Sequence, residues 1–137
     1  MQMRSFGARL AFVATIVLPL VSCQQVARLQ AIKVFRDANM QYQRADYEAA
    51  ADMYEEVIAN DPDHEDAYFY LANSYDNLFR PALRGERDND LLLEKAIDNY
   101  ISSVDIQTEP AMRTLSMQYL VAAFGPDKAN DPTKQEP

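Results

Sequence analysis

Few side chains in this sequence could carry out nucleophilic, redox or metal chemistry. The 137 residues include one cysteine, Cys23, and one histidine, His64. A single cysteine cannot close an internal disulfide, and this set supplies neither a cysteine-based zinc site nor a multi-histidine site. Ser102 and Ser103 have no base in their local sequence that would activate a hydroxyl. We therefore expect no catalytic residue, no resident metal and no cofactor, and we do not expect an enzyme.

Two short acidic segments, residues 61–66 and 88–90, could in principle attract a cation. Neither has the ligand spacing and central glycine of a calcium loop. Helix capping explains the first segment and a solvated loop explains the second. We predict no metal site in either.

Cys23 follows a segment whose composition differs from the rest of the chain. Arg4 and Arg9 precede an apolar run over residues 10–21. This run is shorter than the roughly 20 apolar residues that a membrane-spanning helix needs. A short positive region followed by such a run is typical of a secretory signal peptide. We predict that residues 1–22 are this signal.

The last residues of this segment, Leu20-Val21-Ser22-Cys23, resemble the lipobox of bacterial lipoproteins. The resemblance implies that the signal is cut before Cys23 and that this cysteine is then lipidated. The acyl chains of this lipid, such as palmitate, would hold the protein to a membrane. Gln24 stands where an aspartate would retain a lipoprotein in the inner membrane of enteric bacteria, so the resemblance favours the outer membrane. The alternative is an ordinary signal or anchor with an incidental cysteine.

Beyond residue 30, apolar residues recur with the period of amphipathic helices, which predicts an all-α fold. Asp46 is placed to cap one helix. Asp61-Pro62 is expected to end that helix and to cap the next one. Gly125-Pro126 is expected to stop the last helix. The clearest helical face consists of Tyr47, Ala50, Tyr54, Val57 and Ile58.

Small and aromatic residues also repeat at matching positions along the chain. This repetition resembles the tetratricopeptide repeat, a helix–turn–helix unit of about 34 residues. The resemblance implies a short α-solenoid of about two and a half repeats, with five helices. The repeats cover residues 31–64 and 65–108, and a half repeat covers 109–124. The matching residues are Ala38, Ala50, Tyr54, Tyr68, Leu71, Ala72, Tyr75, Ala96, Tyr100, Leu115, Ser116 and Tyr119.

The helical domain is predicted to span residues 23–126. A loop is inserted over residues 80–90, and residues 127–137 form a disordered tail. Arg80, Arg84 and Arg87 concentrate positive charge in the inserted loop. They are candidates for contact with an acidic partner or a lipid phosphate; the alternative is a solvated loop balanced by its own acids.

In tetratricopeptide proteins, the first helix of each pair lines a groove that receives peptides or partner helices. Asn39 and Asn73 occupy equivalent positions, where peptide-binding members bond the ligand backbone. The family's clamp for chaperone tails is not expected, since Phe35 replaces its first lysine. The alternative is that these side chains pack within the short array. The candidate groove residues are Phe35, Asn39, Tyr42, Phe69, Asn73, Asn77, Met117 and Val121.

The charge balance bears on partners. The net charge is −8, and removal of Arg4 and Arg9 with the signal brings it to about −10, which excludes nucleic acid as a partner. We expect a lipid-anchored envelope adaptor or assembly factor with a protein or peptide partner. The alternative is a stoichiometric structural or accessory subunit of a larger membrane-associated complex. Self-association is a further expectation, because short arrays bury each face only on a neighbour.

One expectation concerns distance from the membrane. Residues 24–30 contain no glycine, proline or serine, so the helical pattern can begin almost at Cys23. The array is therefore expected to lie near the membrane surface.

Overall fold

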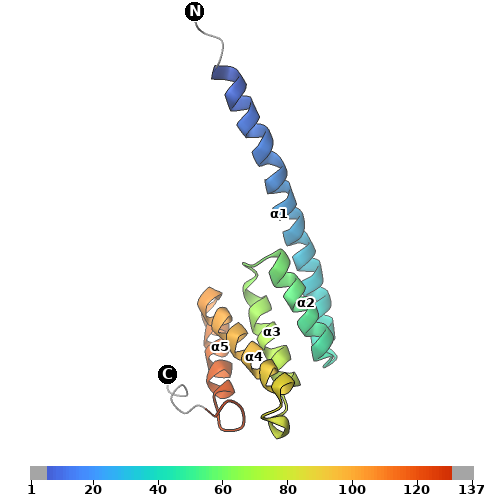
Figure 1. The fold of residues 1–137 in the computed structure, drawn as a ribbon, viewed down its shortest axis with the longest axis vertical. Helices are drawn as coiled ribbons and strands as arrows, with labels where there is room; N and C mark the ends of the chain where they lie inside the picture. Colours follow the sequence, from blue (N-terminus) through green and yellow to red (C-terminus); the bar gives the residue numbers. More distant parts are fainter. Residues whose placement is uncertain (1–5, 131–137) are drawn as a thin grey trace, which may run out of the picture.

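Five α-helices follow one another in the computed structural model, which describes residues 6–130, with side chains from residue 24 onward (Figure 1). The side chains of the predicted signal, the thiol of Cys23 and residues 131–137 of the predicted tail lie outside this description. A single-turn 3-10 helix, η1 (Pro81–Leu83), lies between α3 and α4. The helices are α1 (Phe6–Gln43), α2 (Tyr47–Asn60), α3 (Glu65–Leu78), α4 (Arg87–Ile106) and α5 (Pro110–Ala123).

Each helix packs mainly against the next one in the chain, from α1 on α2 to α4 on α5. Figure 1 shows this succession as a single row, with the first part of α1 projecting beyond the other helices. The predicted all-α fold, a short tetratricopeptide-like array of five helices, is confirmed. Among the residues described, no helix is both long and apolar enough to cross a membrane.

The residues predicted at the small positions lie where helices meet. Ala38 and Ala50 are fully buried between α1 and α2, and Ala72 and Ala96 are fully buried between α3 and α4. Small side chains let two helix backbones approach closely, and larger neighbours then fill the space around the contact. Ser116 is also fully buried, and its hydroxyl lies 2.8 Å from the Ser103 hydroxyl, which joins α5 to α4.

The turn between α1 and α2 has specific local chemistry. Ala45 has φ 60°, in the left-handed region, and its N–H bonds the Tyr42 carbonyl at 2.9 Å. The Asp46 N–H bonds the Gln41 carbonyl at 3.0 Å, so the end of α1 is a Schellman motif in which alanine replaces the usual glycine. The Asp46 carboxylate then accepts from the Ala49 N–H, which confirms the predicted cap of α2.

The predicted cap at Asp61-Pro62 is wrong in part. Asp61 is the C-cap of α2, but α3 begins only at Glu65, with His64 at its N-cap position. Two further turn residues therefore separate the helices. Arg28 of α1 holds this turn: its guanidinium lies 3.3 Å from the Asp61 carboxylate and 3.0 Å from that of Asp63.

The inserted segment is more ordered than predicted. The irregular part ends at Glu86, and residues 87–90 form the first turn of α4. Asn89 explains the difference, because its buried amide both accepts from the Arg80 N–H at 2.8 Å and donates to the Arg80 carbonyl at 3.1 Å. A polar side chain thus fixes the loop to the helix, as a backbone pair would.

The first residues of the predicted tail are also placed. Residues 125–130 form turns after α5, and the Ala129 N–H returns to the Ala123 carbonyl at 3.0 Å. The Lys128 ammonium lies 2.5 Å from the carboxylate of Asp76, which is only 7% exposed, on α3. This charge-assisted contact is strong because Asp76 is shielded from water. Residues 127–130, predicted as the start of a disordered tail, therefore continue these turns, with Lys128 bound to α3.

Candidate functional site

Aromatic rings from every helix meet along the array and form what we call the aromatic cluster. Tyr70 of α3 lies at its centre, with ring centroids 6.0 Å from Phe35, 5.5 Å from Tyr42 and 5.8 Å from Tyr54. Offset and edge contacts at such distances stabilise beyond the area that they bury. The members are Phe35, Tyr42, Tyr54, Phe69, Tyr70, Tyr100 and Tyr119.

Asn73 is used inside the structure. It is 4% exposed, and its amide oxygen accepts from the Tyr42 hydroxyl at 2.5 Å and from the Asn77 amide at 2.9 Å. Its amide nitrogen donates to the Tyr100 hydroxyl at 3.2 Å. The resemblance implies that this asparagine bonds a ligand backbone. In this structure, its groups instead join α1, α3 and α4.

The other candidate groove residues fall into two groups, those with partners inside the structure and those exposed at its surface. Asn39 is half-buried and accepts from the Tyr54 hydroxyl at 2.6 Å. Phe35 packs against the His64 ring at 4.3 Å, and Phe69 is buried. By contrast, Met117 is 45% exposed, and Val121, one turn further along α5, is half-buried. The structure therefore holds most candidates of α1 and α3 in internal contacts, while Asn77 is exposed beside Asn73. The candidates of α5 have no helix over them within the described residues.

Tyr119 is a surface residue that the sequence analysis did not include in the groove. It is 38% exposed, and its ring packs on Phe69 at 5.5 Å and on Tyr100 at 5.8 Å. Its register as the repeat tyrosine predicted packing, but no helix follows α5 within the described residues to cover it. Tyr119 is two residues from both Met117 and Val121, so it lies on the opposite side of the helix. The outer surface of α5 is therefore formed by Met117 and Val121.

The loop arginines do not form one site. The side chains of Arg80, Arg84 and Arg87 are all exposed. The Arg84 guanidinium donates to the Pro126 carbonyl at 3.0 Å, which ties the loop to the turn after α5. Arg80 alone lines a cavity between α2 and α4, whose other charged residues are mostly acidic. An acidic partner is therefore less favoured at this loop than the sequence suggested.

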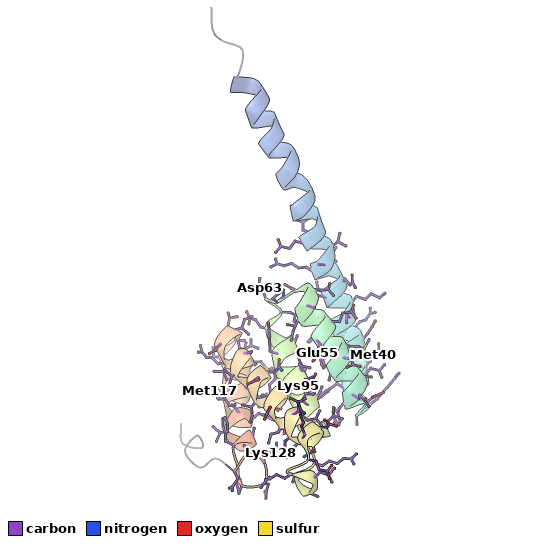
Figure 2. All side chains as sticks on the ribbon, viewed as in Figure 1. Met40, Glu55, Asp63, Lys95, Met117 and Lys128 are labelled. Carbon is purple, nitrogen blue, oxygen red and sulfur yellow. The ribbon has the colours of Figure 1, made fainter. Side chains whose placement is uncertain are left out.

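A polar cluster at this cavity joins α2, α3 and α4. The Tyr75 hydroxyl donates to the Glu55 carboxylate, and the Lys95 ammonium lies 3.1 Å from the same hydroxyl. Figure 2 labels Glu55 and Lys95, whose carboxylate and ammonium are 3.5 Å apart. The hydrogen bond to Tyr75 raises the pKa of Lys95. A lysine with a raised pKa stays protonated at neutral pH, so it binds as a cation and does not serve as a base.

The acidic turn at residues 61–66 lines a second cavity, together with Gln107 and Glu109. Glu65 is occupied there, since its carboxylate accepts from the N–H of Thr108 at 2.9 Å and from its hydroxyl at 2.8 Å. These bonds lower the pKa of Glu65. Within residues 24–130, no group of histidine, cysteine and acidic side chains is arranged to hold a metal ion.

No protein-family model, curated protein sequence or solved structure matches this chain. The remaining surface feature is the distribution of exposed large apolar side chains. None lies on α2 or α3, and two, Leu91 and Ile101, lie on α4. The other six lie on the two terminal helices, each of which packs mainly on one neighbour. They are Val26, Leu29, Ile32 and Met40 on α1, and Met117 and Tyr119 on α5.

The buried tyrosines predict sensitivity to alkaline pH. Burial raises the pKa of Tyr54 and of Tyr100 well above the usual value of 10.0. In the unfolded chain these hydroxyls ionise near pH 10, whereas the folded array keeps them neutral. Their contribution to stability is therefore complete below pH 10 and is lost as the pH rises above it. Urea unfolding at increasing pH should show the free energy of unfolding fall above pH 10.

The variant Tyr54→Phe provides the control for this prediction. It keeps the ring and has no hydroxyl to ionise, so its stability should fall less steeply with pH than that of the unaltered protein. Equal slopes for both proteins would assign the alkaline loss to other groups.

Proposed function

We propose that this chain is a tetratricopeptide-type lipoprotein of a bacterial envelope, anchored by lipid on Cys23, that acts as an adaptor or assembly factor by binding a protein partner. The observation that carries the proposal is the exposed apolar surface at the ends of a helical array. Helical repeats bury their faces only on neighbouring repeats, so an unpaired terminal helix offers a surface that another protein can complete.

The outer surface of α5 is the site that we assign to the partner. Met117 is exposed, and Val121, one turn further along the same side of the helix, is half-buried. Methionine is enriched at protein interfaces, since its flexible side chain can pack against surfaces of varied shape. The natural occupant is a helix of the partner, packed where the second helix of a third repeat would lie.

The test is crosslinking in the native membranes. A photo-crosslinking residue at position 117 is expected to capture one defined protein, identified by mass spectrometry. The same group at Glu94, an exposed position on α4, is the matched control and should not capture it. Val121→Glu, combined with the crosslinker at 117, should remove the product without changing the helical circular dichroism.

Two outcomes would contradict the proposed site. Equal capture from positions 94 and 117 would show that the contact is not specific to α5. A product that survives Val121→Glu would show that the apolar surface does not hold the partner. Capture at a fixed one-to-one ratio with a large complex would favour the alternative, a stoichiometric subunit.

A further inference from the structure

The other terminal helix carries a second exposed surface, which we call the outer α1 face. It consists of Val26, Leu29, Ile32, Lys33, Arg36 and Met40. We propose that this face lies in the headgroup region of an anionic lipid membrane, beside the lipid on Cys23. The proposal rests on the lipid anchor proposed above and assigns an orientation of the array that the anchor alone does not fix.

The face is apolar where a soluble helix would be polar. Val26, Leu29 and Ile32 are 64%, 69% and 60% exposed, more than any other large apolar side chains in the described residues. The opposite side of the same helix contains Ala31 and Ala38, which are fully buried. A helix with one buried side and a second apolar side has more apolar surface than its packing on α2 uses.

The charges of this region differ in sign from those of the remaining chain. Asp37 is the first of the 21 acidic residues, and in a chain cut before Cys23 three basic residues, Arg28, Lys33 and Arg36, precede it. Arg28 is paired with Asp61 and Asp63, and Arg36 is paired with the adjacent Asp37, so Lys33 supplies the net positive charge of the outer α1 face. A short basic and apolar helix face on an otherwise acidic protein complements anionic headgroups, which repel the acidic remainder.

The face also lies next to the proposed anchor. The helix is continuous from Phe6 to Gln43, so no flexible segment separates residue 23 from the face. With a rise of about 1.5 Å per residue, Val26 lies about 5 Å and Ile32 about 14 Å along the axis from residue 23. An anchored protein therefore meets this membrane at a very high local concentration, and even a weak contact is occupied.

A membrane explains this face better than a protein does. Its apolar members near the anchor are aliphatic, and the face has no aromatic ring, whereas rings dominate the energetics of protein interfaces. The ring-to-ring contacts of the described residues lie mainly in the aromatic cluster, which includes Tyr119 of α5. Figure 2 shows Met40 and Met117 at opposite ends of the row of helices, so one end can rest on lipid while the other remains free.

The experiment uses the full lipidated protein in vesicles of phosphatidylethanolamine and phosphatidylglycerol. Because lipid blocks the thiol of Cys23, a single added cysteine takes a spin label. Labels at Leu29→Cys and Ile32→Cys are expected to collide several-fold less often with a water-soluble nickel chelate than a label at position 117 does. The same two labels should collide more often with oxygen, which concentrates in the membrane. Met117→Cys is the matched control, an exposed apolar position far from the anchor, and should stay accessible to the chelate.

Each other result overturns the proposal. Labels at 29 and 32 that remain as accessible as the label at 117 would leave this face in water. Spin–spin broadening between copies at position 29 would assign the face to a second copy of the chain. The mass of the protein reports separately whether Cys23 carries lipid. Failure of the anchor is thus distinguished from failure of the face, because a lipidated protein with accessible labels refutes only the face.

Discussion

Replacing Cys23 with serine is expected to abolish incorporation of labelled fatty acid and to release the protein from membranes. The proposed anchor forms through the cysteine sulfur, and a serine hydroxyl is a far weaker nucleophile than a thiolate. Each buried methylene of an acyl chain contributes about 0.8 kcal/mol to membrane binding, so two or three chains account for nearly all of the retention. The measurement is metabolic labelling with palmitate, followed by separation of membrane and soluble fractions.

The matched control for this prediction is Ser22→Ala. It keeps a small residue before Cys23, as the lipobox requires, and leaves the sulfur in place. Labelling and fractionation should therefore match those of the unaltered protein. Labelling that persists in Cys23→Ser would show that the four residues are not a lipobox, and residues 1–22 would then be an ordinary signal or anchor.

The fold could be predicted because its main signals are local and repeated. Ala38 and Ala50 in one pair, and Ala72 and Ala96 in the next, recur with aromatic residues at fixed helical spacing. Where two helices cross closely, only a small side chain fits between their backbones, so few other residue types are possible at that position. For this reason the sequence identified these four alanines, and the structure buries all of them completely.

The inserted segment could not be read in the same way. Residues 87–90 are polar, and polar residues beside a proline and a glycine are typical of a loop. They are helical because the Asn89 side chain bonds both the N–H and the carbonyl of Arg80. This contact forms only when the start of α4 lies beside the end of α3, which the local sequence does not specify. The same holds for Lys128 and Asp76, which are 52 residues apart in sequence.

The candidate groove was predicted from the position of each residue within its repeat. That position does not determine which other side chains the residue contacts. The resemblance to tetratricopeptide repeats predicted that Asn73 bonds a ligand, yet its partners here are Tyr42, 31 residues earlier, and Tyr100, 27 residues later. Whether an amide faces a ligand or two tyrosines depends on the curvature and length of the whole array. Met117 remains exposed because no helix follows α5 in the described chain, and Asn77 is exposed although its amide bonds Asn73.

Tyr100 is the residue whose loss should destabilise the array most. Its ring is fully buried in α4 and contacts Phe69 and Tyr119, and its hydroxyl bonds Asn73 at 3.2 Å and Asp76 at 3.3 Å. Tyr100→Ala is expected to lower the free energy of unfolding by about 3–5 kcal/mol, as large-to-small aromatic substitutions do in cores. The free energy of unfolding of a small domain is about 5–15 kcal/mol in total, so this loss is severe. The measurement is urea unfolding followed by helical circular dichroism.

Two variants separate packing from hydrogen bonding at this position. Tyr100→Phe keeps the ring but leaves the Asn73 amide nitrogen without its acceptor, while Asp76 keeps Lys128 as a donor. The lost hydrogen bonds should cost about 1–3 kcal/mol. Tyr119→Ala removes a ring of the same cluster that is already 38% exposed, and should cost less than Tyr100→Ala. If Tyr100→Ala costs no more than Tyr100→Phe, the polar bonds hold α3 to α4. If the alanine loss is much larger, the aromatic cluster holds them, and the polar chain through Asn73 mainly fixes their register.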